Sequence, residues 1–99
     1  MVSTTGFDTI GVSFASMRTS TGFSSNQFYY SIDSGLSWTD FRSYSPGTSF
    51  GLQSFDLSGI DGIANNPNAG FRIVFAGATG STGNNRIDNL LVSGLPVQP

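Results

Sequence analysis

The sequence predicts an all-β protein: an antiparallel β-sandwich of jelly-roll type with about six to eight short strands. Three observations predict this class. Apolar residues recur at every second position in several short runs, which is the period of a strand with one buried face. Segments rich in Gly, Ser, Thr and Asn separate these runs and are typical of turns. Glu and Lys, which usually coat helix surfaces, are absent.

The first expected strand covers 7–17, where Ile10, Val12 and Phe14 alternate with small polar residues. A loop rich in Ser, Thr and Gly follows at 19–25. The next apolar alternation predicts a second strand over 26–32.

A turn motif follows this second strand and has the pattern Ser-x-Asp-x-Gly-x-x-Trp, with its defined residues at Ser31, Asp33, Gly35 and Trp38. The Asp33 carboxylate is placed to accept hydrogen bonds from backbone amides of the turn. Gly35 can adopt a positive φ without a Cβ clash, and the Trp38 ring is expected to fold back over the turn. The motif therefore predicts a hairpin whose second strand spans 38–41. It resembles the Asp-box of sialidases and many other secreted β-proteins, in which it is a structural hairpin away from the active site.

The remaining expected segments are a loop at 43–51, a strand at 52–57, one helical turn within 58–68, a strand at 69–76, a loop at 77–85 and a last strand at 86–92. The last strand is apolar at odd and even positions alike, which favours a central place in a sheet. The expected organisation is one β-sandwich domain over 1–94, followed by a tail or linker at 95–99.

Composition excludes several classes of function. The net charge is −2 and the four arginines are scattered, so there is no basic patch for nucleic acid. No apolar run approaches the ~20 residues that a membrane-spanning helix needs. His, Cys and Glu are absent, which removes the usual general bases, the thiol nucleophile and the common zinc ligands. We therefore expect no enzymatic activity, no nucleic-acid partner and no membrane insertion.

Several segments resemble jelly-roll, galactose-binding-like domains of secreted bacterial proteins of the PEP-CTERM type. They are the run Ser3–Phe14, the strand Phe71–Phe75 with the following segment Gly80–Leu90, and the end Gly94–Pro99, which is similar to a linker before a sorting tail. The resemblance implies an extracellular or cell-surface protein of a bacterium, without a defined activity. Such domains have further strands before the segment that begins at Ser3. On this resemblance the sequence is an excised fragment, a minimal version of the domain, or a subunit that another chain completes. An incomplete sandwich has unpaired strand edges, for which we expect a homo-oligomer or a neighbouring domain as partner.

Calcium is the cofactor that the residues suit best, because it prefers oxygen ligands. Asp88 resembles the final-strand Asp that often supplies a ligand in calcium-binding carbohydrate-recognition jelly rolls. In the alternative interpretation, Asp88 hydrogen-bonds a neighbouring loop or pairs with Arg86 or Arg72.

Three side chains are candidates for binding a glycan: Tyr29, Tyr44 and Arg72. Tyr29 points to the opposite face from its neighbours on the strand, and Tyr44 is expected in a loop. Exposed aromatic rings with polar partners can hold sugar faces and hydroxyls, although such residues also pack into cores or interfaces.

Two functions are consistent with these observations. The first is a non-catalytic extracellular structural or assembly domain that completes its sheet with a neighbouring chain. The alternative is a carbohydrate-binding module that recognises extracellular glycan, with a structural calcium. We favour the first, because no cluster of residues in the sequence requires a ligand.

Overall fold

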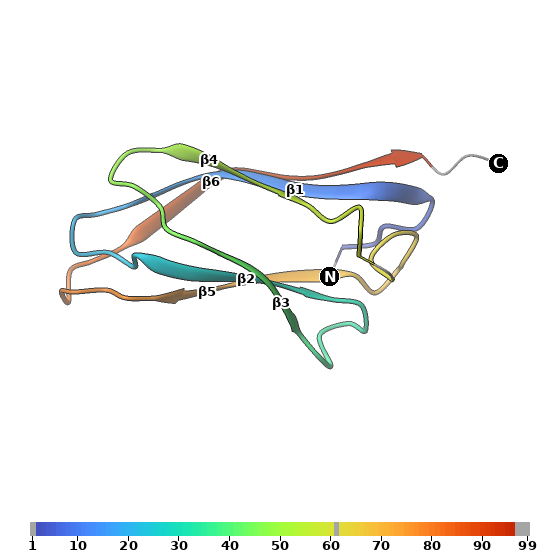
Figure 1. Cartoon of the computed structure of the whole chain (residues 1–99), viewed down its shortest axis with the longest axis horizontal. Coiled ribbons are helices and arrows are strands. Elements are labelled where there is room, and N and C mark those ends of the chain that lie inside the picture. Colours follow the sequence, from blue (N-terminus) through green and yellow to red (C-terminus); the bar gives the residue numbers. More distant parts are fainter. Residues whose placement is uncertain (1, 61, 97–99) are drawn as a thin grey trace.

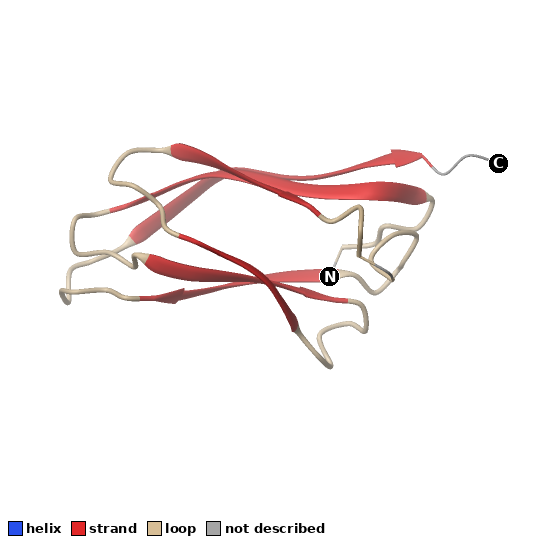
Figure 2. Cartoon of the chain, in the orientation of Figure 1, coloured by secondary structure: helices blue, strands red, loops and turns tan. Residues whose placement is uncertain are grey.

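A computed structural model describes residues 2–60 and 62–96 of the chain. These residues form six strands: β1 (Phe7–Arg18), β2 (Ser25–Ser31), β3 (Thr39–Tyr44), β4 (Gly51–Asp56), β5 (Gly70–Ala76) and β6 (Asn85–Pro96). The prediction of an all-β chain is confirmed, and the described residues include no helix (Figure 2).

The strands form two antiparallel sheets of three strands, with the orders β4-β1-β6 and β3-β2-β5. The sheets lie one over the other, as in a β-sandwich (Figure 1). Only the β2–β3 connection joins neighbours within one sheet, and every other connection passes from one sheet to the other. In the described part of the chain, no helix is long and apolar enough to cross a membrane.

The core lies between the two sheets and follows the predicted alternation of β1. Ile10, Val12 and Phe14 are all buried. Phe28 of β2 packs between the sheets, with its ring centroid 4.6 Å from that of Phe55 on β4. Because both sheets contribute buried apolar side chains to this contact, burial of apolar area holds them together.

The last strand differs from the prediction in position and length. It pairs with β1 alone and forms an edge of its sheet, whereas its composition favoured a central place. It also includes Leu95 and Pro96, which were expected in the tail and instead lie opposite Asp8 and Phe7 on β1. Residues 97–99 of the expected tail lie outside the described residues. The apolar residues of β6 are therefore more exposed than a central strand would leave them.

Two local predictions were wrong. Tyr44, expected in a loop, is the last residue of β3 and is only 8% exposed. Its ring packs edge-on against Phe14, with centroids 5.5 Å apart, so apolar packing extends the strand past the predicted end. The expected helical turn within 58–68 is a series of turns in its described residues, in which Gly62 and Asn65 have positive φ values of 88° and 50°.

Candidate functional site

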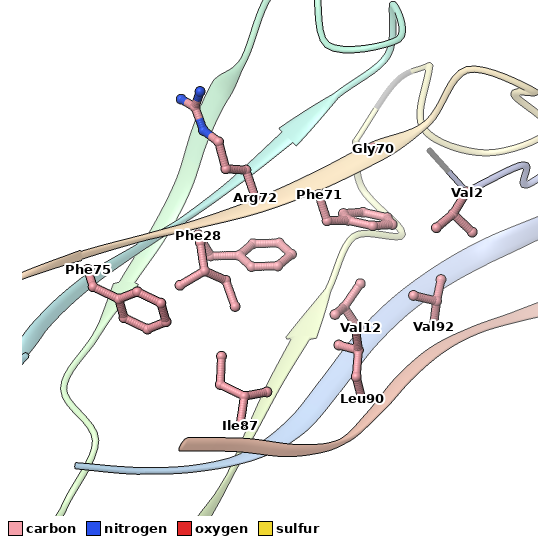
Figure 3. A pocket seen from close by; sticks show the side chains of 11 residues that line it. Val2, Val12, Phe28, Gly70, Phe71, Arg72, Phe75, Ile87, Leu90 and Val92 are labelled. Carbon is pink, nitrogen blue, oxygen red and sulfur yellow. The ribbon is translucent and has the colours of Figure 1, made fainter. Parts of the chain in front are cut away.

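One long side of the sandwich is open. β5 and β6 are the edge strands on this side, and they belong to different sheets. Between them lies a groove of about 290 Å³. Figure 3 shows Phe71 and Phe75 of β5 pointing across this groove towards Ile87, Leu90 and other residues of the second sheet.

The groove is apolar because the inward residues of both edge strands are apolar. Phe71, Ile73 and Phe75 alternate along β5 at the period of a strand. Ile87 and Leu90 line the groove from β6. Arg72 is the one charged residue among the lining residues, and its side chain points away from the groove (Figure 3).

Large apolar side chains on the open side are exposed to solvent. Leu90 is 65% exposed, Phe75 is 38% exposed and Ile87 is 37% exposed, and all three line the groove. Covering such residues is favourable by about 25 cal/mol for each Å² of apolar surface removed from water. A contiguous apolar surface of this kind is typical of sites that bind another chain. The open side can thus bury apolar side chains, and its lining supplies no acid or base for catalysis.

The predicted turn motif forms the hairpin between β2 and β3. The hydroxyl of Ser31 donates to Asp33 Oδ1 at 2.7 Å, and the N–H of Gly35 donates to the same hydroxyl at 2.9 Å. Asp33 Oδ1 accepts the N–H of Ser37 at 2.9 Å, as predicted for this carboxylate. Within the loop that connects the strands, the N–H of Leu36 donates to the carbonyl oxygen of Asp33 at 3.3 Å. Ser34 and Gly35 between them have positive φ values of 60° and 83°, as do the central residues of a type I′ turn.

Hydrogen bonding stabilises the charged form of Asp33. The Ser37 hydroxyl, the Ser37 backbone N–H and the Ser31 hydroxyl all bond this carboxylate and lower its pKa to about 2. Since these bonds connect the two ends of the turn, Asp33 has a structural role. The low pKa comes from the hairpin itself, so it does not indicate an active site.

Two of the three predicted glycan-binding side chains come together on the outer face of the β3-β2-β5 sheet. Tyr29 and Arg72 are cross-strand partners on β2 and β5. The guanidinium carbon of Arg72 lies 4.7 Å from the ring centroid of Tyr29 and 4.7 Å from that of Trp38. Trp38 was predicted only as part of the turn, and its contact with Arg72 links the turn to β5. Tyr44 lies apart from this cluster and is buried in the core.

Asp88, the predicted calcium ligand, is exposed on β6. Its Oδ1 accepts the backbone N–H of Asn89 at 2.8 Å. Asn89 has a φ of 55° and lies at a register shift between β6 and β1, so Asp88 supports a β-bulge. The described residues contain no group of three or more acidic, His or Cys side chains that could hold a metal ion. Calcium binding by Asp88 stays a prediction.

Sequence reasoning did not identify the groove. The sequence predicted both strands that line the groove, β5 and β6. It did not predict that they lie beside each other, because this depends on the order of strands in the two sheets. The apolar residues at both odd and even positions of β6 were a usable signal, because an edge strand with this composition leaves one apolar face unburied.

No family model, curated protein or solved structure matches the chain. Its relation to secreted jelly-roll domains therefore stays a prediction that rests on the sequence segments quoted above.

Proposed function

We propose that this chain is a non-catalytic structural domain that assembles through the open side of its sandwich, completing its sheets with a neighbouring chain. The observation that carries the proposal is the apolar groove between β5 and β6. Both strands are sheet edges, and an edge strand presents backbone N–H and C=O groups that another strand can pair.

The resemblance to jelly-roll domains of secreted bacterial proteins supports an extracellular setting for this assembly. The composition agrees with it, because the chain has no Lys, His, Cys or Glu and is rich in Ser, Thr, Asn and Gly. A sandwich of this type with an open side is well suited to a surface protein that assembles with its neighbours.

Size-exclusion chromatography with light scattering, across a dilution series, tests the proposal. Leu90→Lys places a charge on the open side, whereas Leu52→Lys places the same charge on β4, the opposite edge of the same sheet. Both leucines are largely exposed, at 65% and 74%, so neither change should disturb the core. We expect the parent chain and Leu52→Lys to associate and Leu90→Lys to remain at 10.4 kDa. Equal behaviour of the two variants, or a monomeric parent chain at every concentration, would contradict the proposal.

A second candidate function is glycan binding on the outer face of the β3-β2-β5 sheet. The Tyr29–Arg72–Trp38 cluster favours it, because aromatic rings and a positioned guanidinium can contact sugar faces and hydroxyls. Screening against immobilised glycans, with and without calcium, tests this function. Binding that is lost in Tyr29→Ala and retained in Tyr44→Phe would support it, and the absence of binding to any glycan would count against it.

A further inference from the structure

In the described part of the chain, the edge of β5 is unpaired from Gly70 to Ala76, and Val2 bridges Ala69 just before the strand. This edge is the most regular one on the open side. β5 pairs with β2 along its whole length, from Gly70 to Ala76, without a register shift. β6, in contrast, has register shifts near both Thr9 and Asn89 in its pairing with β1. A regular edge without Pro or Lys lacks the features that usually prevent strand addition.

The sequence of β5 is self-complementary about Ile73. In an antiparallel pair of β5 strands with Ile73 on the two-fold axis, Phe71 lies opposite Phe75 of the other copy, and Arg72 lies opposite Val74. The pairing brings aromatic residues together on the groove side, and cross-strand aromatic pairs stabilise sheets. On the outer face it avoids placing Arg72 directly opposite a second Arg72, which would be unfavourable.

We propose that the neighbouring chain is a second copy of this chain, related by a two-fold axis at Ile73, with the two β5 strands paired antiparallel. This proposal rests on the assembly function above and names its partner and register. The two sheets of order β3-β2-β5 then become one six-stranded sheet. The contact is isologous, so it closes at a dimer.

The same two-fold axis explains the composition of β6. Because β6 lines the same groove as β5, the axis brings the open sides of both copies together. Ile87 and Leu90, which are 37% and 65% exposed in one copy, then face apolar side chains of the other copy. The mixed apolar pattern of β6 suits a strand that is covered in the dimer.

Charge at Val74 tests the register. Val74 is 40% exposed, so a charged side chain there can be tolerated by the single copy. Val74→Glu places a carboxylate opposite Arg72 of the other copy, and Val74→Arg places a like charge there. Each dimer contains two such pairs, so we expect about 2- to 30-fold tighter association for Val74→Glu and a similar weakening for Val74→Arg. Ser43→Glu and Ser43→Arg, at exposed positions on the far edge strand β3, are the matched controls and should leave association unchanged.

Cysteine cross-linking provides an independent test, because the chain contains no Cys. Opposed residues of antiparallel strands have Cα atoms about 4.5–5.5 Å apart, within the range of a disulfide. Ile73→Cys should therefore form a covalent dimer on mild oxidation, and Val74→Cys should form little, since residue 74 faces residue 72 of the other copy.

The outcomes separate the two proposals. If the parent chain associates, but Val74→Glu and Val74→Arg associate equally and Ile73→Cys does not cross-link, assembly stands and the β5 register is wrong. If the parent chain is monomeric at every concentration, both proposals are wrong.

Discussion

The guanidinium of Arg72 lies over the ring of Trp38 on the outer surface of one sheet, with the guanidinium carbon 4.7 Å from the ring centroid. Tyr29 contacts the same guanidinium at the same distance. A single cation thus connects β5, β2 and the end of the turn that precedes β3.

This contact predicts a measurable coupling between Arg72 and Trp38. In a double-mutant cycle of Arg72→Met and Trp38→Leu, we expect a coupling free energy of about 0.5–1 kcal/mol, as for exposed cation–π pairs. Urea unfolding followed by circular dichroism measures it. Arg42, whose guanidinium lies over the ring of Phe41 at 5.1 Å, is the control: Arg42→Met should not couple to Trp38→Leu.

Because of Asp33 in the turn, we expect the free energy of unfolding to decrease at acid pH. Hydrogen bonds from Ser37 and Ser31 lower the folded-state pKa of Asp33 to about 2, well below the usual range of an Asp carboxyl. A carboxyl group with a lowered folded pKa stabilises the fold above its unfolded pKa and loses this contribution as pH falls through the folded pKa. The free energy of unfolding should therefore fall between about pH 4 and about pH 2, and Asp33→Asn should reduce this fall. Asp8→Asn, which changes an exposed carboxylate outside the turn, is the matched control. Identical slopes in all three proteins would contradict the prediction.

The central contact of the core predicts a large loss of stability at Phe28. Phe28 is 1% exposed and stacks on both Phe55 and Phe71. Phe28→Ala should lower the free energy of unfolding by about 3–5 kcal/mol, a large share of the roughly 5–15 kcal/mol of a typical domain. Leu52→Ala, on an exposed edge, should change it by less than about 0.5 kcal/mol. Urea midpoints at low protein concentration compare the two.

For Tyr44 we expect that removing its hydroxyl does not destabilise the fold. Burial raises the pKa of its hydroxyl, and the nearby side chains of Asn26 and Ser16 partly offset this effect. Among the described residues, however, neither of them lies in good hydrogen-bond geometry with the Tyr44 hydroxyl. Removing a buried polar group that lacks a partner avoids a desolvation penalty of about 1–3 kcal/mol. Tyr44→Phe should thus leave the thermal midpoint unchanged or raise it. A clear decrease would show that the hydroxyl makes a stabilising contact.

Local pattern was sufficient to predict much of the fold. Alternation identified Ile10, Val12 and Phe14 as a buried face, and the motif around Asp33 predicted both its hydrogen bonds and the positive φ of Gly35. These features depend on residues that are close in sequence, so strand period and turn chemistry determine them.

Features that depend on the pairing of distant segments were not predictable. The end of β3 at Tyr44 is set by contacts with Phe14 of the other sheet. The edge position of β6 is set by the order of strands around β1. The candidate site belongs to this second group, because Phe75 and Leu90 meet only through the topology of the two sheets.

Amide hydrogen exchange at low and high protein concentration tests the central claim, assembly through the open side, most directly. It reports on each edge strand separately, since an amide that gains a strand partner exchanges more slowly. If the chains assemble through the open side, amides of β5 and β6 gain protection as concentration rises, whereas those of the opposite edges, β3 and β4, do not. Protection that is independent of concentration, or gained at β3 and β4 instead, would contradict it.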